Sequence, residues 1–130
     1  MNRAVDLIRE SKVFFIATTE GDQPRVRPFG VVADIHDKVY LATDNTKKCF
    51  RQMLENPKVE MAGMLPDGRW IRVTGVLVHD PSREAKVEFL RQSEYMANIY
   101  TVDDGIFEVL YFSSGVLEVV GHGESEFIEL

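Results

Sequence analysis

Two adjacent lysines, Lys47 and Lys48, stand where the chain passes from polar residues into a segment with helical spacing. The apolar residues of this segment recur at the i, i+3 and i+4 positions of one helix face: Phe50, Met53 and Leu54. A helix N-terminus already carries partial positive charge and unpaired N–H groups, so lysines there are slightly unfavourable. Their placement therefore indicates an anion bound between the lysines and the helix start. Lysines that are simply solvated are the alternative interpretation.

The residues just before the lysines can complete such an anion site. The run Asp44-Asn45-Thr46 is typical of helix caps, because each side chain can accept a hydrogen bond from an N–H group of the first turn. Because it directly precedes the lysines, Thr46 is expected to cap the helix and to offer its hydroxyl to a phosphate group.

A second source of positive charge lies upstream, on a predicted strand. Arg25 and Arg27 are two residues apart, so their side chains point to the same face of that strand. Pro28 has no N–H to donate, which indicates that regular strand pairing stops there, and Gly30 permits a close approach of the backbone. Together with Phe29, this run offers a ligand a cation, an unpaired backbone and an aromatic ring. An ordinary solvated strand face is the alternative.

The elements that must position these residues are mostly strands. Apolar and β-branched runs between turn signals predict strands over residues 13–19, 25–33, 38–43, 58–65, 69–79, 106–112 and 115–120. Helices are predicted over residues 2–11, from Lys47 to about residue 55, and from Pro81 onward. So many strands favour a mainly β fold, a closed or partly closed barrel with flanking helices, because closure removes exposed sheet edges. An open α/β sandwich is the competing architecture.

Finer predictions concern the second half of the chain. Ser113-Ser114 is expected to turn the chain between the last two strands, and residues 95–105 are expected to be irregular. The acid-rich end from Glu118 to Glu129 is expected to be a solvated tail. The helix that follows Pro81 is expected to turn its apolar residues toward the core, namely Val87 and Leu90, with Phe89 beside them.

Length and composition limit the class of protein. The 130 residues, 45% of them hydrophobic, fit one domain over residues 1–130. No apolar run approaches the roughly 18 residues that a membrane span needs, and the N-terminus lacks an apolar signal-peptide core, so a cytoplasmic protein without membrane contact is predicted. The formal net charge of −6 argues against a broad nucleic-acid surface but leaves room for a local cationic pocket.

Neither a metal site nor a catalytic residue is evident. The one cysteine, Cys49, cannot form an internal disulfide and is expected to be a partly buried helix residue, with a reactive thiol as the alternative. The histidines His36, His79 and His122 are scattered and have no HxH or HxxxH partner, so no metal site is expected. No side chain stands out for proton transfer, and catalytic residues are therefore left unassigned.

Short motifs occur along the chain in a recognisable order: Gln23-Pro24-Arg25-Val26-Arg27-Pro28-Phe29, Val39-Tyr40-Leu41-Ala42-Thr43, Thr46-Lys47-Lys48, Glu55-Asn56-Pro57-Lys58-Val59 and Arg69-Trp70-Ile71-Arg72-Val73-Thr74-Gly75. In order and spacing they resemble the pyridoxamine-phosphate-oxidase-like FMN-binding split-barrel family. The resemblance covers about residues 1–120. It implies a homodimeric split β-barrel that binds FMN in the dimer interface.

The resemblance also implies which residues hold the FMN phosphate. Arg27 would meet the phosphate from its strand, and Thr46, Lys47 and Lys48 would hold it from the helix start. The spacing from Lys48 to Asn56 is one residue longer than the family pattern, which leaves the register of the lysines open.

For the flavin ring, the resemblance implies contacts from other segments. The backbone of Pro28 and Phe29 would run along the edge of the isoalloxazine ring, and Thr43 would line the ribityl and ring region. Trp70 and Arg72 would come from the second subunit. Trp70 as an ordinary barrel or interface aromatic is an equal alternative.

For activity, the resemblance implies redox chemistry on a small molecule, as a flavin reductase or a nitroreductase-like enzyme. Oxidation of pyridoxamine phosphate itself is not expected, because Val31-Val32 stand where the true oxidases carry a lysine and residues 123–126 are rich in Glu where those enzymes carry Arg and His. One alternative is a non-catalytic protein of the same fold that binds or carries flavin, deazaflavin or haem, or acts in a stress response. Another is a structural dimer without a cofactor.

Overall fold

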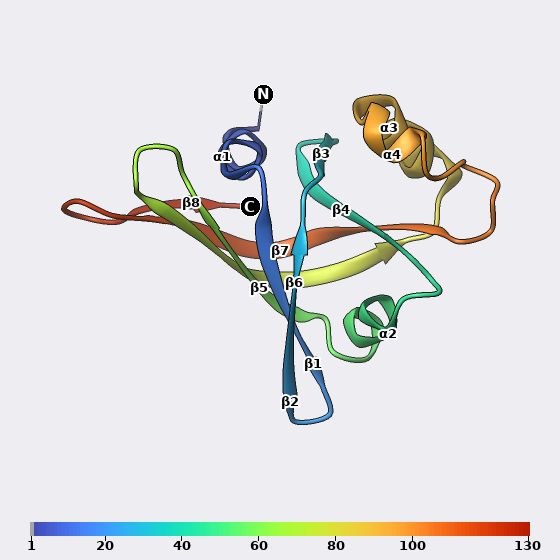
Figure 1. Cartoon of the computed structure of the whole chain (residues 1–130), viewed down its shortest axis with the longest axis horizontal. Helices are drawn as coiled ribbons and strands as arrows, with labels where there is room; N and C mark the ends of the chain where they lie inside the picture. The colour runs from blue at the N-terminus through green and yellow to red at the C-terminus, as the bar shows by residue number, and fades with distance from the viewer. Residues whose placement is uncertain (1) are drawn as a thin grey trace.

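One antiparallel sheet organises the chain, and Figure 1 shows it in the computed structural model, which describes residues 2–130. The strand order is β2-β1-β5-β6-β7-β4-β3, with β8 paired to β7. The strands are β1 (Phe14–Glu20), β2 (Gln23–Phe29), β3 (Val32–Ile35), β4 (Lys38–Asp44), β5 (Lys58–Met64), β6 (Trp70–Asp80), β7 (Phe107–Val120) and β8 (Glu126–Glu129). The helices are α1 (Arg3–Ser11), α2 (Lys48–Glu55), α3 (Arg83–Gln92) and α4 (Glu94–Ala97). The prediction of a mainly β fold is confirmed, whereas barrel closure and dimerisation stay predictions.

Strand β7 connects the parts of the sheet because it pairs with β6 along most of its length, with β4 near its start and with β8 near its end. Its side chains enter both hydrophobic clusters of the core. Phe107 and Val109 enter the cluster that contains Phe89 of α3. Phe112 and Leu117 enter the larger cluster, which also receives the apolar face of α1. Both clusters are therefore fixed relative to one strand.

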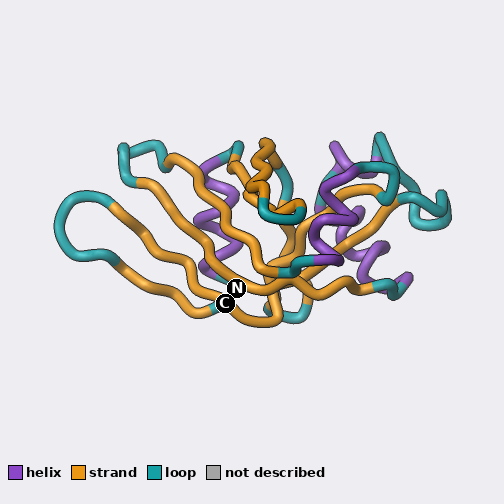
Figure 2. The backbone as a smooth tube through the Cα atoms, turned by 90° about the horizontal axis from the view of Figure 1, so that it is seen from below, coloured by secondary structure: helices purple, strands orange, loops and turns teal. Residues whose placement is uncertain are grey.

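Helices α1 and α3 cover the sheet as capped, amphipathic segments. Asn2 caps α1 by accepting a hydrogen bond from the N–H of Val5, and Ile8 of this helix is fully buried. Ser82 caps α3 in the same way, and Phe89 buries that helix against the second cluster. Most helical turns lie toward the end of the molecule opposite the β7–β8 loop (Figure 2). None of the helices in residues 2–130 is long and apolar enough to cross a membrane.

The predicted turn at Ser113-Ser114 is wrong, because β7 continues through these residues as a single strand. On the facing strand, Val76 pairs with Ser114 and Leu77 pairs with Phe112, so Ser113 is the extra residue of a β-bulge. A bulge bends a strand without ending it. The serine pair therefore marks a bend within one strand, and the two strands expected here are one.

The chain end and the α3–α4 region also differ from expectation. The acid-rich end is not wholly a solvated tail, because β8 pairs with β7 from Glu126 opposite Val119 onward. Part of the region expected to be irregular is helical, since Ser93 caps the short helix α4. On α3, Val87 is 41% exposed whereas Phe89 is fully buried. Phe89, not Val87, is thus the centre of the buried face.

Gly75 of β6 lies where a side chain has no room. A Cβ atom there would stand 2.5 Å from the carbonyl oxygen of Ser114 and 2.7 Å from the ring of Phe112. Gly75→Ala is expected to lower the free energy of unfolding by about 1–3 kcal/mol, the usual cost of overpacking, as measured by urea denaturation. Gly30→Ala is the matched control, because the nearest atom to its Cβ, the oxygen of Lys12, is 3.8 Å away. An equal loss in both variants would contradict the packing argument.

Candidate functional site

A groove runs along the protein where β2, β4, α2 and the α4 region meet. It consists of two adjoining hollows of about 480 and 460 Å³, which share the lining residues Arg27, Lys47 and Cys49. The larger hollow, called the apolar end here, is lined mainly by apolar and aromatic side chains: Phe29, Val31, Ala42, Tyr95, Met96, Ile99 and Tyr100. The smaller hollow is called the cationic end. One groove therefore joins two chemically different surfaces.

The cationic end collects positive charge from two elements. Arg25 and Arg27 reach it from β2, and Lys47 and Lys48 reach it from the start of α2. Glu20 is the one carboxylate among the lining residues that the structure describes, and it is bound to Arg25 at 2.9 Å. Arg25, with a smaller contribution from Lys48, lowers the pKa of Glu20. Arg27 and the two lysines are thus left with their positive charge.

The guanidinium of Arg27 is held in place by side chains from β1 and α2. Nη1 donates to the hydroxyl of Thr18 at 2.7 Å, and Nη2 donates to Oε1 of Gln52 at 2.7 Å. The hydroxyl of Thr18 in turn donates to the same Gln52 oxygen at 2.5 Å. Figure 1 shows how this is possible, since α2 lies beside the β1–β2 hairpin. The arginine is therefore fixed between a strand and a helix.

Helix α2 begins at Lys48, with Lys47 as its N-cap residue and no side-chain capping hydrogen bond. The prediction that Thr46 caps this helix is wrong. Its N–H donates to Asp44 at 3.0 Å, and its hydroxyl donates to the same carboxylate oxygen. The proton of the Thr46 hydroxyl is thus committed to Asp44, and the first N–H groups of α2 are left uncapped. These groups, beside both lysines, are suited to an anion.

Asp44 connects the two ends of the groove. Its second oxygen accepts a hydrogen bond from the hydroxyl of Tyr100, a wall residue of the apolar end, at 2.5 Å. Burial alone raises the pKa of Asp44, but the hydrogen bonds from Thr46 and Tyr100, aided by Lys47, outweigh burial and leave this pKa below its usual value. Burial, together with Asp44, raises the pKa of Tyr100 to about 12. At neutral pH the pair is a carboxylate and a neutral phenol.

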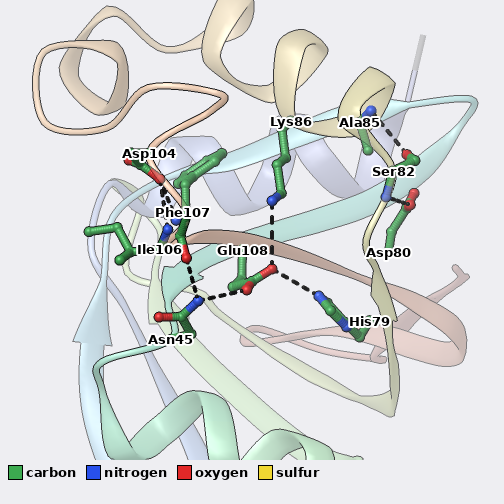
Figure 3. Close-up of polar contacts among 11 residues, drawn as sticks. Asn45, His79, Asp80, Ser82, Ala85, Lys86, Asp104, Ile106, Phe107 and Glu108 are labelled. Carbon is green, nitrogen blue, oxygen red and sulfur yellow. Dashed lines mark hydrogen bonds and ion pairs between the residues drawn. The ribbon is translucent and has the colours of Figure 1, made fainter.

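A second polar cluster fixes the loop between β4 and α2 (Figure 3). Glu108 of β7 accepts a hydrogen bond from Nδ2 of Asn45 at 2.9 Å and contacts Nε2 of His79 at 3.0 Å. Lys86 of α3 stands 3.9 Å away on the same carboxylate. The ring of His79 also packs edge-on against Phe50 of α2, with centroids 5.2 Å apart. Glu108 thus joins Asn45 of the loop to β6 and α3, and His79 packs on the helix that follows the loop.

Most residues predicted to bind a cofactor lie along the groove: Arg27, Pro28, Phe29, Thr43, Lys47 and Lys48. Thr46 stands beside the groove without lining it. Trp70 and Arg72 lie elsewhere, on the outward side of β6, where the guanidinium stands 4.8 Å from the Trp70 ring centroid and pairs with Glu60 and Glu118. Within one chain these two residues do not join the groove. Their place in a second subunit's site stays a prediction.

The expected end of strand pairing at Pro28 is wrong. Pro28 pairs with Phe15, and pairing continues to Phe29 opposite Phe14. Proline is tolerated because β2 is an edge strand of the described sheet, so that its missing N–H costs no ladder hydrogen bond. Regular pairing stops two residues later, at Gly30.

Sequence reasoning missed the residues that enclose and brace the groove. Gln52 is 5% exposed on the inner side of α2, whereas Leu54, which was expected there, is 49% exposed. The helical period would have placed Gln52 on the buried face of α2 only if a polar residue had been accepted on that face. Tyr95, Met96 and Ile99 come from the segment that was expected to be irregular. The only sequence signal for this wall of the groove was the aromatic and apolar character of these residues.

Replacing the Asp44 carboxylate should produce a pH-dependent loss of stability. Because its pKa is lowered on folding, the carboxylate stabilises the fold above its unfolded pKa of about 3.9, and that stability is lost as pH falls through the folded pKa. Asp44→Asn is expected to cost about 1.5–3 kcal/mol at pH 7, the range of hydrogen bonds to a charged group, and less below pH 4. Denaturation at both pH values measures this. A cost that is independent of pH would contradict it.

Comparison with known proteins identifies a family model and a solved structure that match nearly the whole chain. A family model described as "Pyridoxamine 5'-phosphate oxidase" matches residues 2–117. The structure of a NimC/NimA family protein from Clostridium acetobutylicum is 50% identical, with a TM-score of 0.96, over 98% of this chain and 90% of that chain. No match was found among the curated proteins.

More distant structures share the fold alone. A pyridoxamine 5'-phosphate oxidase-related, FMN-binding protein from Nostoc punctiforme is 14% identical, with a TM-score of 0.67, over 98% of this chain and 93% of that chain. A haem-binding protein from Mycobacterium smegmatis is 17% identical, with a TM-score of 0.73, over 98% of this chain and 58% of that chain. Given the family match over residues 2–117 and the close likeness to the clostridial structure, the chain belongs to the pyridoxamine 5'-phosphate oxidase family.

Proposed function

We propose that this protein binds FMN in the groove and uses it for redox chemistry on a small molecule. The observation that carries the proposal is the chemical division of the groove, with cations and an uncapped helix start at one end and apolar walls at the other. FMN has the same division, with a phosphate at one end and a flat, largely apolar ring at the other. The FMN-binding relative of the same fold is consistent with this.

The cationic end fits a phosphate group. Arg27 offers a planar guanidinium, which suits phosphate oxygens, and Lys47 and Lys48 add two mobile charges. The first N–H groups of α2 add donors whose partial charge favours an anion. Thr46 would orient the loop through Asp44 and would not donate its hydroxyl proton to the ligand.

The apolar end fits the isoalloxazine ring. Phe29 and Val31 line it from the end of β2 and the residues that follow, and Met96 and Ile99 line it from the α4 region. Apolar walls with few polar groups are the usual setting for a flat cofactor, because burial supplies affinity and the polar groups fix its orientation. The hydroxyl of Thr43, which lies 3.3 Å from Sγ of Cys49, supplies a polar group where the two ends meet.

The chemistry would belong to the cofactor. A bound flavin supplies hydride and electron transfer, whereas the protein supplies anchorage, orientation and access. Here the cationic end would hold the phosphate, and the backbone of Pro28 and Phe29 would lie along the ring edge. The half-exposed side chain of Ile99 and the more exposed Tyr95 leave the apolar end open to a small substrate. A flavin reductase or nitroreductase-like activity would use this opening.

Haem is a less suitable occupant, although a haem-binding protein shares the fold. None of His36, His79 and His122 lines the groove in the part of the chain that the structure describes, so haem iron would need a ligand such as Cys49 or Met96. A carrier that holds flavin without catalysis would use the same groove. Absorption spectra separate haem from flavin, and turnover with a nicotinamide donor separates an enzyme from a carrier.

We further propose a homodimer formed through the outward side of the sheet. Large apolar residues on this side are at least half exposed: Phe15, Val26, Met64 and Phe127. Strand pairing places them with Trp70 and Arg72, since Met64 is opposite Trp70. Because Pro28 lies opposite Phe15 and also lines the groove, a second copy on this face would reach the groove. Trp70 and Arg72 of that copy would then complete the site.

Reversal of one charge at the cationic end tests the FMN proposal. The purified protein is expected to show a flavin absorption band or to quench FMN fluorescence on titration. Lys48→Glu should weaken FMN binding at least tenfold, since it replaces attraction by repulsion at the phosphate, and should leave riboflavin binding unchanged. Lys38→Glu, with the same charge change outside the groove, should leave both unchanged. No flavin binding by the folded wild-type protein would refute the proposal.

Phe15→Asp tests the dimer. A charge buried in an apolar interface carries a large desolvation cost, so this variant is expected to elute as one 14.8 kDa chain where the wild-type protein elutes as two. FMN affinity should fall with it, because the second copy would no longer complete the site. Val87→Asp on α3 changes a similarly exposed apolar residue away from this face and should remain dimeric. A monomeric wild-type protein that binds FMN would refute the shared site.

A further inference from the structure

Gln52 occupies a place on α2 that the helix would normally give to an apolar residue. It is 5% exposed, and its neighbour across the interface, Thr18 of β1, is 2% exposed. Buried polar groups are costly unless they are hydrogen-bonded, and both of these are bonded to each other and to Arg27. Thr18 and Gln52 can therefore be buried because their hydrogen bonds with each other and with Arg27 satisfy them.

The hydrogen bonds of the Arg27 guanidinium use Nη1 and Nη2. Besides its bond to Thr18, Nη1 donates to the carbonyl oxygens of Ile16 at 3.3 Å and of Arg25 at 3.5 Å. Nη1 and Nη2 both point at the Thr18–Gln52 pair, each at 2.7 Å. No hydrogen bond is recorded for Nε of Arg27 with residues 2–130. Because the group is planar, its Nε–H and the second Nη2–H lie parallel on the opposite edge, the fork that matches two phosphate oxygens. Arg27 lines both ends of the groove, so a ligand bound there lies beside its guanidinium.

The acceptor is a neutral amide, and its neutrality matters. A carboxylate at this place would hold the guanidinium as well but would cancel its charge. Gln52 holds it without doing so, and its own Nε2 donates to Glu20 at 3.5 Å, while Glu20 is bound to Arg25. Glu20, the one carboxylate among the described lining residues of the cationic end, is thus bonded to Arg25 and Gln52. Gln52 therefore orients the Arg27 guanidinium without neutralising its positive charge.

We propose that Gln52, together with Thr18, is a positioning residue that presents the Nε–H edge of Arg27 to the phosphate of the bound flavin. This inference rests on the proposed function, because it assigns the anion at the cationic end to FMN. A long arginine side chain held before binding loses less freedom when the ligand arrives, so positioning raises affinity without a new contact to the ligand. The effect is specific for ligands that carry the phosphate.

The test compares FMN with riboflavin, which lacks the phosphate, by fluorescence titration of the apoprotein. Gln52→Met keeps the shape and removes the acceptor, and it should weaken FMN binding about tenfold while changing riboflavin binding less than about twofold. Gln52→Glu keeps the acceptor and adds a charge, and it should weaken FMN binding further. Thr18→Val, nearly isosteric, should weaken FMN binding less than Gln52→Met. Retained riboflavin binding shows that each variant is folded.

Gln92 provides a matched control. It is a partly buried glutamine whose amide oxygen also accepts from an arginine, Arg9, at 3.0 Å, but it lies on α3 outside the groove. Gln92→Met should leave the ratio of FMN to riboflavin affinity unchanged. An unchanged ratio in both Gln52→Met and Thr18→Val, with a wild-type protein that prefers FMN, would overturn the positioning role alone. A wild-type protein without preference for FMN would instead overturn the proposed phosphate site.

Discussion

The groove depends on strand β7, because both ends of the groove are fixed relative to this strand. Thr43 of β4 pairs with Glu108 of β7, which determines where the chain leaves the sheet and α2 begins. The Glu108 side chain then holds Asn45 in that loop. On the other wall, Tyr100 packs on Phe107 of β7, with ring centroids 5.1 Å apart. A change in β7 would thus reach the anion-binding loop and the apolar wall together.

The electrostatics of the site depend on where each carboxylate finds its donor. The chain carries a net charge of −6, yet Lys47 and Lys48 keep their charge beside Arg27. This is possible because the two carboxylates on which these lysines act, Glu20 and Asp44, are bonded to other donors. Glu20 pairs with Arg25, and Asp44 accepts from Thr46 and from the phenol of Tyr100. The cationic end of the groove can therefore have a positive potential although the protein as a whole is acidic.

Local sequence rules predicted those features of the site that depend on one element at a time. The two-residue strand period placed Arg25 and Arg27 on one face, and both line the cationic end. Helical spacing placed Phe50 and Met53 on the buried side of α2, and both are buried. The start of this helix was predicted to within one residue, since it begins at Lys48. The mainly β fold followed from turn signals between β-branched runs.

What these rules could not give depends on contacts between distant segments. Ser113-Ser114 has the composition of a turn, and only its pairing with β6 makes it a bulge. The acidic residues of β8 have the composition of a tail, and only the exposed edge of β7 orders them. Thr46 has the side chain of a helix cap, but α2 begins one residue later than a Thr46 cap requires, with Lys47 as its N-cap residue, and the Thr46 hydroxyl donates to Asp44.

Gln52 shows most clearly why sites escape pattern reading. An amphipathic helix is recognised by the apolar residues on its inner face, so a glutamine counts against that face and Leu54 was assigned in its place. The glutamine is buried because its partners come from β1 and β2, Thr18 and Arg27, and no local rule brings them to α2. A polar residue at a core position of such a helix requires distant polar partners. In this chain those partners include the arginine that faces the groove, so the exception to the pattern lies where core and site meet.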